Sequence, residues 1–81
     1  MNYDIRIDKP ARKFIERQPK DQQARILKAI ANLPAIGDIK PLQGQPEVYR
    51  LRVGSYRIIY TIQEELVILV MNIGNRGDIY K

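Results

Sequence analysis

The feature that most constrains the fold is a pair of strand-like segments separated by only two residues. In Val48–Val53 and in Tyr56–Ile62 apolar and polar side chains largely alternate, as they do along β-strands. Gly54-Ser55 lies between them, and glycine as the first residue of a two-residue loop favours a type II′ turn. The sequence therefore predicts a β-hairpin whose register is fixed by its turn.

This register divides the side chains of the hairpin between the two faces of a sheet. One face carries apolar and aromatic side chains that suit packing against helices: Tyr49, Leu51, Val53, Tyr56, Ile58 and Tyr60. The other face carries Arg50, Arg52 and Arg57, and Arg52 lies directly opposite Arg57. Like charges in that position destabilise a sheet, and no acidic residue occurs between Glu47 and Glu64 to neutralise them.

Two interpretations fit these arginines. They can be ordinary surface residues whose stems cover apolar neighbours such as Ile59 while the charges stay in water. Three guanidinium groups on one face, two of them opposed, instead favour an anion site, because the planar guanidinium binds phosphate through paired hydrogen bonds. A phosphodiester backbone is the natural ligand of such a site.

The rest of the chain completes an α+β architecture in a single domain, residues 1–81, with two helices packed on one face of an antiparallel sheet of three to four strands. Prolines near the first turn of one helix and after the last turn of the other mark helix boundaries. The predicted elements are a strand at Tyr3–Ile7, a helix from Asp8 to Pro19, a helix from Asp21 to Leu33, a turn-rich connection from Pro34 to Glu47, the hairpin, a strand at Leu66–Ile73 and an extended stretch at Asp78–Tyr80.

The strand at Leu66–Ile73 is expected to widen the arginine-bearing face. With Glu64-Glu65 as a two-residue turn, Asn72 lies opposite Arg57. The same register places an apolar patch on that face: Ile59, Ile68 and Val70, with Leu66 nearby. An exposed apolar patch beside a basic groove indicates a protein partner.

Arg76 and Tyr80 follow beyond that strand, within reach of the arginines. An aromatic ring beside clustered arginines suits base stacking combined with phosphate contact. A terminal tyrosine can equally pack on the edge of the sheet.

Composition narrows the chemistry further. Fourteen Lys and Arg against nine Asp and Glu give a formal net charge of +5, which favours polyanionic partners. The absence of cysteine and histidine excludes a disulfide framework and a thiolate metal site, and removes the commonest general base. No apolar run is long enough to span a bilayer and no signal peptide is evident, so we expect a cytoplasmic domain without a membrane partner.

The first predicted helix concentrates basic residues against one acid, Glu16. These residues form either a solvated helix face or a surface that contacts RNA phosphates: Lys9, Arg12, Lys13, Arg17 and Lys20.

The succession of these motifs resembles the RelE/ParE toxin superfamily over essentially the whole chain. The resemblance rests on Leu42-Gln-Gly44, on the Tyr-Arg-Leu-Arg-Val-Gly-Ser-Tyr-Arg-Ile-Ile-Tyr run within Val48–Tyr60, on Ile73-Gly-Asn-Arg76 and on Tyr80. It is closer to RelE, because ParE-like gyrase inhibitors generally lack this basic set.

RelE toxins are messenger RNA interferases that act on the ribosome, each silenced by a cognate antitoxin. The resemblance implies cleavage of mRNA in the ribosomal A site by 2′-hydroxyl attack on the adjacent phosphate, without metal or small-molecule cofactor. It assigns Arg50 and Arg52 to two basic positions of the first hairpin strand, Arg57 to phosphate binding, Arg76 to protonation or charge stabilisation of the leaving 5′-oxygen, and Tyr80 to orienting the nucleotide.

Well-studied RelE proteins carry lysines at the first two of these positions, where this chain has Arg50 and Arg52. This difference implies a slower enzyme than the lysine-bearing relatives. Arginine stays protonated, so Arg52 is a poor general base. Either the guanidinium groups act mainly by electrostatic stabilisation, or Glu47 or Tyr80 accepts the proton. Two other functions are compatible with the sequence: a ParE-like inhibitor of DNA gyrase without chemistry of its own, and a non-catalytic nucleic-acid-binding relic of the same fold.

Overall fold

One strand and two helices precede four consecutive strands in the computed structural model, which describes residues 3–64 and 66–75. In chain order the elements are β1 (Asp4–Ile7), α1 (Lys9–Glu16), α2 (Lys20–Ala31), β2 (Asp38–Pro41), β3 (Val48–Val53), β4 (Tyr56–Gln63) and β5 (Val67–Asn75). The α+β class, the helix pair and the β3–β4 hairpin predicted from the sequence are confirmed. The extended stretch predicted at Asp78–Tyr80 lies outside the described residues.

The five described strands form one sheet in the order β1-β5-β4-β3-β2. β1 runs parallel to β5 and every other neighbouring pair is antiparallel, so the sheet is mixed rather than wholly antiparallel. β2 lies within the segment that was predicted to be a turn-rich connection, with no strand assigned to it. Ile39 of β2 packs against the core while Asp38 and Lys40 beside it are exposed, and this alternation is too short to stand out in a segment rich in glycine and proline.

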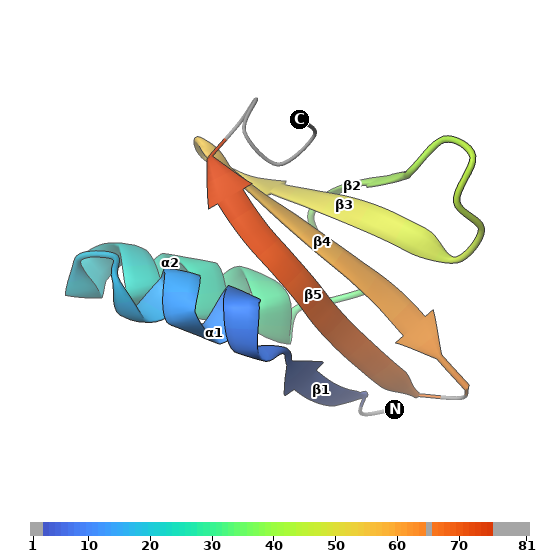
Figure 1. Ribbon diagram of the computed structural model, residues 1–81, viewed down its shortest axis with the longest axis horizontal. Coiled ribbons are helices and arrows are strands. Elements are labelled where there is room, and N and C mark those ends of the chain that lie inside the picture. The colour runs from blue at the N-terminus through green and yellow to red at the C-terminus, as the bar shows by residue number, and fades with distance from the viewer. Residues whose placement is uncertain (1–2, 65, 76–81) are drawn as a thin grey trace.

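Both helices cover the same face of the sheet (Figure 1). Their buried residues pack on the apolar side of the strands and form the core: Ala11, Ile15, Ile26 and Ile30 from the helices, and Leu51, Val53, Tyr56, Ile58, Tyr60, Ile68, Val70 and Ile73 from the strands. The hairpin face predicted to meet the helices is therefore the one that does.

The junction between the two helices is tied to the hairpin. The Tyr56 hydroxyl donates a hydrogen bond to Gln18 Oε1 at 3.1 Å, and the Gln18 amide donates to the carbonyl of Phe14 at 3.1 Å. The rings of Phe14 and Tyr56 meet edge to face with their centroids 5.8 Å apart. These contacts hold the turn end of the hairpin against the helices and so fix the orientation of its opposite face.

The register of β5 differs from the prediction. Residues 64–66 connect β4 to β5, so the connection is one residue longer than a Glu64-Glu65 turn and Gln63 pairs with Val67. A slip of one residue moves every side chain of a strand to the other face. Ile68 and Val70, predicted to lie beside the arginines, are instead fully buried in the core at 0% exposure.

A bulge farther along β5 shifts the pairing by a second residue, which returns the side chains that follow to the predicted face. The register of β4 and β5 shifts between Ile59 and Tyr60, and beyond that point Ile59 pairs with Asn72 while Arg57 pairs with Gly74. Asn72 is therefore on the predicted face, but the prediction that it lies opposite Arg57 is wrong.

Candidate functional site

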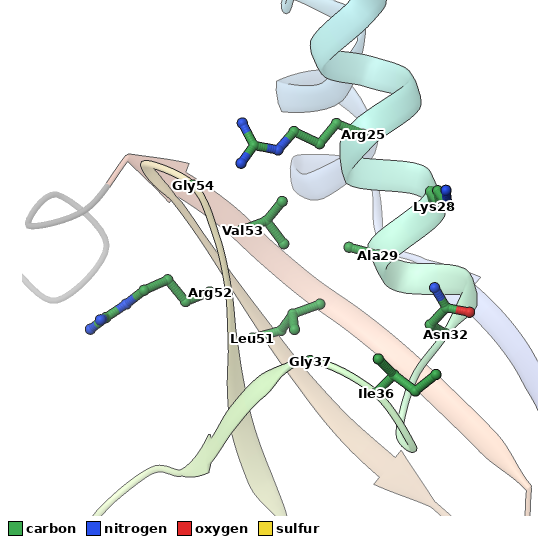
Figure 2. Close-up of a pocket in the computed structure, with 10 residues that line it drawn as sticks. All are labelled: Arg25, Lys28, Ala29, Asn32, Ile36, Gly37, Leu51, Arg52, Val53 and Gly54. Atoms are coloured by element: carbon green, nitrogen blue, oxygen red, sulfur yellow. The ribbon is translucent and has the colours of Figure 1, made fainter.

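Arg50, Arg52 and Arg57 lie on the face of the sheet that is turned away from the helices, as predicted. Arg52 pairs directly with Arg57 across β3 and β4, and Arg50 pairs with Ile59. Figure 2 shows Val53 projecting toward α2 while Arg52 projects to the opposite side of the strand. We refer to the surface formed by these three arginines as the arginine face.

Arg50 is a buried residue of this face. It is 7% exposed, and its Nη1 donates to the Asp38 carbonyl at 3.2 Å and to Asp38 Oδ1 at 3.3 Å. The expectation that no acid neutralises the arginines is therefore wrong, because β2 carries Asp38 alongside β3. This pair has little signature in the sequence, since its two members are separated by the turn-rich segment.

Arg52 and Arg57 are both partly exposed. The Nη1 of Arg52 lies 3.9 Å from Asp38 Oδ2, which is an ion pair but too long for a hydrogen bond. Its Nε is buried and has no hydrogen-bond partner among the described residues. The two guanidinium groups leave from directly opposed positions, so they concentrate positive charge near the turn of the hairpin.

Apolar side chains adjoin this charge, although they are not all those expected. Ile59 is present and 8% exposed. In the observed register Leu69 pairs with Thr61 and Val67 with Gln63, which places these two partly buried residues on the arginine face in place of Ile68 and Val70. Leu66, in the β4–β5 connection, is 36% exposed.

The basic cluster of the first helix is separate from the arginine face. α1 packs on the other side of the sheet (Figure 1), and the basic residues of this region are exposed: Lys9, Arg12 and Lys13 in α1, Arg17 directly after it, and Lys20 at the start of α2. The structure therefore presents two basic surfaces rather than one continuous surface.

Other predicted site residues lie apart from the three arginines or beyond the described chain. Arg76 and Tyr80 lie outside the described residues. Glu47 is exposed at the start of β3, with a left-handed backbone φ of 64°, and its carbonyl accepts a hydrogen bond from Thr61 Oγ1 at 2.7 Å. It thus lies at the end of the hairpin away from the Gly54-Ser55 turn.

A hollow that the sequence analysis did not predict lies between α2 and β3, on the helix side of the sheet (Figure 2). Its volume is about 360 Å³, and its lining includes apolar Leu51 and Val53 below the basic side chains of Arg25 and Lys28. The helical spacing of Arg25, Lys28 and Asn32 was its one sequence signal.

Residues 3–64 and 66–75 contain no group of three or more acidic side chains that could hold a metal ion. Neither helix in this part of the chain is long and apolar enough to cross a membrane.

Solved toxin–antitoxin complexes share this architecture. A chain of the archaeal RelE–RelB complex from Pyrococcus horikoshii superimposes with a TM-score of 0.79 at 29% identity, covering 96% of this chain and 99% of that chain. A chain of the RelB–RelE complex from Methanococcus jannaschii does so with a TM-score of 0.73 at 28% identity, covering 93% and 94%. These likenesses define the class as a RelE-like α+β toxin fold.

Sequence comparison gives the family. The assigned toxin RelE1 of Methanocaldococcus jannaschii is 40% identical over 45 residues, which are 54% of this chain and 50% of that relative, so the match spans about half its length. The model of the ParE toxin of the type II toxin–antitoxin system parDE matches residues 5–80. The chain belongs to this family of type II toxins, and the resemblance to the RelE/ParE superfamily is confirmed.

Proposed function

We propose that this toxin is a ribosome-dependent endoribonuclease that cleaves translated mRNA in the A site and thereby inhibits translation. The observation that carries the proposal is the opposed, partly exposed pair of Arg52 and Arg57, on a sheet face that neither of the two described helices covers. The similarity of this chain to RelE toxins supports the proposal. Action on the ribosome places the toxin in the cytoplasm.

The reaction is a transfer of phosphorus between two oxygens of the same RNA strand. The 2′-oxygen bonds to the adjacent phosphorus while the bond from phosphorus to the 5′-oxygen breaks. The 2′-hydroxyl loses a proton and the leaving 5′-oxygen gains one, which yields a 2′,3′-cyclic phosphate and a 5′-hydroxyl. The phosphorane between these states carries two negative charges, and no metal is required where guanidinium groups stabilise them.

Arg52 and Arg57 supply that stabilisation in the proposed mechanism. A donor aimed at developing charge is worth about 3–4 kcal/mol in the transition state. Four residues of β3 lie between Glu47 and Arg52, so their Cα atoms are roughly 16 Å apart along the strand, and this separation argues against Glu47 as the group that accepts the proton at a phosphate held by Arg52. Electrostatic stabilisation is therefore the main effect, Arg76 serves the leaving oxygen, and Tyr80 orients the nucleotide or accepts the proton.

Primer extension on mRNA bound to programmed ribosomes tests this function. Wild type is compared with Arg57→Ala, Arg76→Ala and the control Lys28→Ala, whose side chain lies on the helix side of the sheet. We expect A-site cuts from wild type and control, and a loss of about 100-fold or more in the other two. The absence of cuts from folded wild type would contradict the proposal.

A cognate antitoxin is the second proposed partner, after the ribosome and its mRNA. The solved archaeal relatives are complexes of RelE with RelB. The apolar residues beside the arginines offer such a partner both burial and charge, and an acidic or amphipathic antitoxin segment would suit them.

Inhibition of DNA gyrase is the alternative function. One observation favours it: the matching family model is described as the ParE toxin of parDE. A gyrase ligand should inhibit supercoiling in a purified assay and should keep that activity after Arg57→Ala, because no phosphate is cleaved. A nucleic-acid-binding relic would be inactive in both assays.

A further inference from the structure

The three arginines of the arginine face do not have equivalent surroundings, and the difference comes from one carboxylate. Asp38 Oδ1 lies 3.3 Å from Nη1 of Arg50, and Asp38 Oδ2 lies 3.9 Å from Nη1 of Arg52. Asp38 enters from β2, whose residues pair with β3 so that Asp38 is directly opposite Arg52. A single negative charge thus bridges two guanidinium groups.

Arg50 is held in place by its contact with Asp38. Its side chain is 9% exposed, and one of its terminal nitrogens donates to both the carbonyl and the carboxylate of Asp38. A buried guanidinium without a counterion is costly, so the ion pair stabilises the charged side chain in place. Little of Arg50 remains accessible to a bound phosphate.

The same carboxylate orients Arg52 by its charge without accepting a hydrogen bond from it. Its side chain is 33% exposed, and its separation from Asp38 is longer than a hydrogen bond. Its terminal nitrogens can therefore still donate to an anion on the outer surface, although its Nε is buried. Arg57 lies directly opposite Arg52 on the neighbouring strand. The direction in which the Arg52 guanidinium points therefore determines whether both groups can contact the same anion.

We propose that Asp38 is a positioning residue that fixes Arg50 as a structural cation and holds the Arg52 guanidinium toward the phosphate. The inference rests on the proposed endoribonuclease function. It divides the arginine face by role: Arg50 anchors Asp38, Asp38 orients Arg52, and Arg52 acts with Arg57 on the substrate.

Asp38→Asn is the decisive substitution, because it keeps the shape and the backbone carbonyl and removes the charge. Loss of a nearby negative charge alone would strengthen anion binding, whereas loss of orientation slows the chemical step. We therefore expect kcat for ribosomal cleavage to fall about tenfold or more while KM stays unchanged or falls. Asp38→Glu restores the charge and should recover part of kcat. Asp4→Asn is the matched control, since Asp4 pairs with Arg6 on β1, at the other edge of the sheet.

A second measurement does not depend on cleavage. Heteronuclear NOE values of the arginine Nε–Hε groups report side-chain mobility, and we expect Asp38→Asn to lower them for Arg50 and Arg52 and to leave Arg6 unchanged. A kcat within twofold of wild type, a loss confined to KM, or an unchanged Arg52 NOE would overturn the proposal. If wild type does not cleave mRNA, the endoribonuclease function fails, and the NOE values still decide the role of Asp38.

Discussion

Tyr60 shows how a single buried residue ties stability to pH. It is 1% exposed in the core, and its ring stacks on Tyr49 with centroids 5.5 Å apart. Burial, and then the neighbouring Tyr49, raises the pKa of Tyr60 from 10.0 to about 12. The folded protein therefore keeps a proton that the unfolded chain releases near pH 10.

We expect the free energy of unfolding to fall as pH rises from 10 toward 12. Below that window both states hold the Tyr60 proton and the stabilisation is complete. Within it only the unfolded state loses the proton, which costs up to roughly 3 kcal/mol of stability. Urea denaturation of wild type and Tyr60→Phe near pH 8 and near pH 11.5 measures this loss. An equal decline in both proteins would assign the effect to other groups.

Two glycines with positive φ should respond differently to substitution. Gly37 has a φ of 139°, and a Cβ there would lie 2.6 Å from Cδ1 of Leu51; Gly44 has a φ of 78° and open space around it. Backbone strain alone costs about 1–3 kcal/mol, so Gly44→Ala should lose about 1 kcal/mol and Gly37→Ala at least about 3. Urea midpoints measure both losses, and equal values would show that the Leu51 contact is readily relieved.

At the scale of elements, the hairpin was predictable because all of its determinants are local. A two-residue turn fixes the pairing of β3 with β4, and that pairing alone places Arg52 opposite Arg57. β2 was not predictable in this way. Its place beside β3 depends on the path of the preceding loop, so the ion pair between Asp38 and Arg50 required the three-dimensional structure.

β5 was predictable as a strand but not in its register. Two features each shift the pairing by one residue: the longer connection after Gln63 and the bulge opposite Ile59 and Tyr60. Neither has a distinctive residue pattern, and the bulge partly hides the first error by returning Asn72 to the predicted face. The roles of Arg76 and Tyr80 depend on the family resemblance alone.

Paired substitutions in β5 check the observed register. Ile68 is fully buried in the core and Leu69 only partly buried on the arginine face. Ile68→Ala should therefore cost about 2–5 kcal/mol of unfolding free energy, and Leu69→Ala about 1 kcal/mol or less. Chemical denaturation gives both values. The reverse order would support the register predicted from a Glu64-Glu65 turn.

At the scale of the whole molecule, the sheet separates two basic surfaces. The arginine face is compact, partly neutralised by Asp38 and bordered by apolar side chains. The cations of α1 lie across the sheet on the exposed side of that helix (Figure 1), and their side chains make no hydrogen bond or ion pair within residues 3–64 and 66–75. The first surface suits a shaped, chemically specific contact, and the second suits sequence-independent contact with RNA phosphates.

This division predicts that the two surfaces can be tested independently. Arg12→Gln/Lys13→Gln should weaken ribosome association mainly at low salt and reduce the steepness of log K against log salt by roughly 1.5, since each lost phosphate contact removes about 0.7–0.9. A-site cleavage at saturating toxin should persist because the arginine face is intact. Cosedimentation with ribosomes across a potassium chloride series measures the slope. Arg6→Gln/Lys28→Gln removes the same net charge elsewhere and should leave the slope unchanged. An equal effect of both pairs would show that net charge, rather than the α1 surface, governs association.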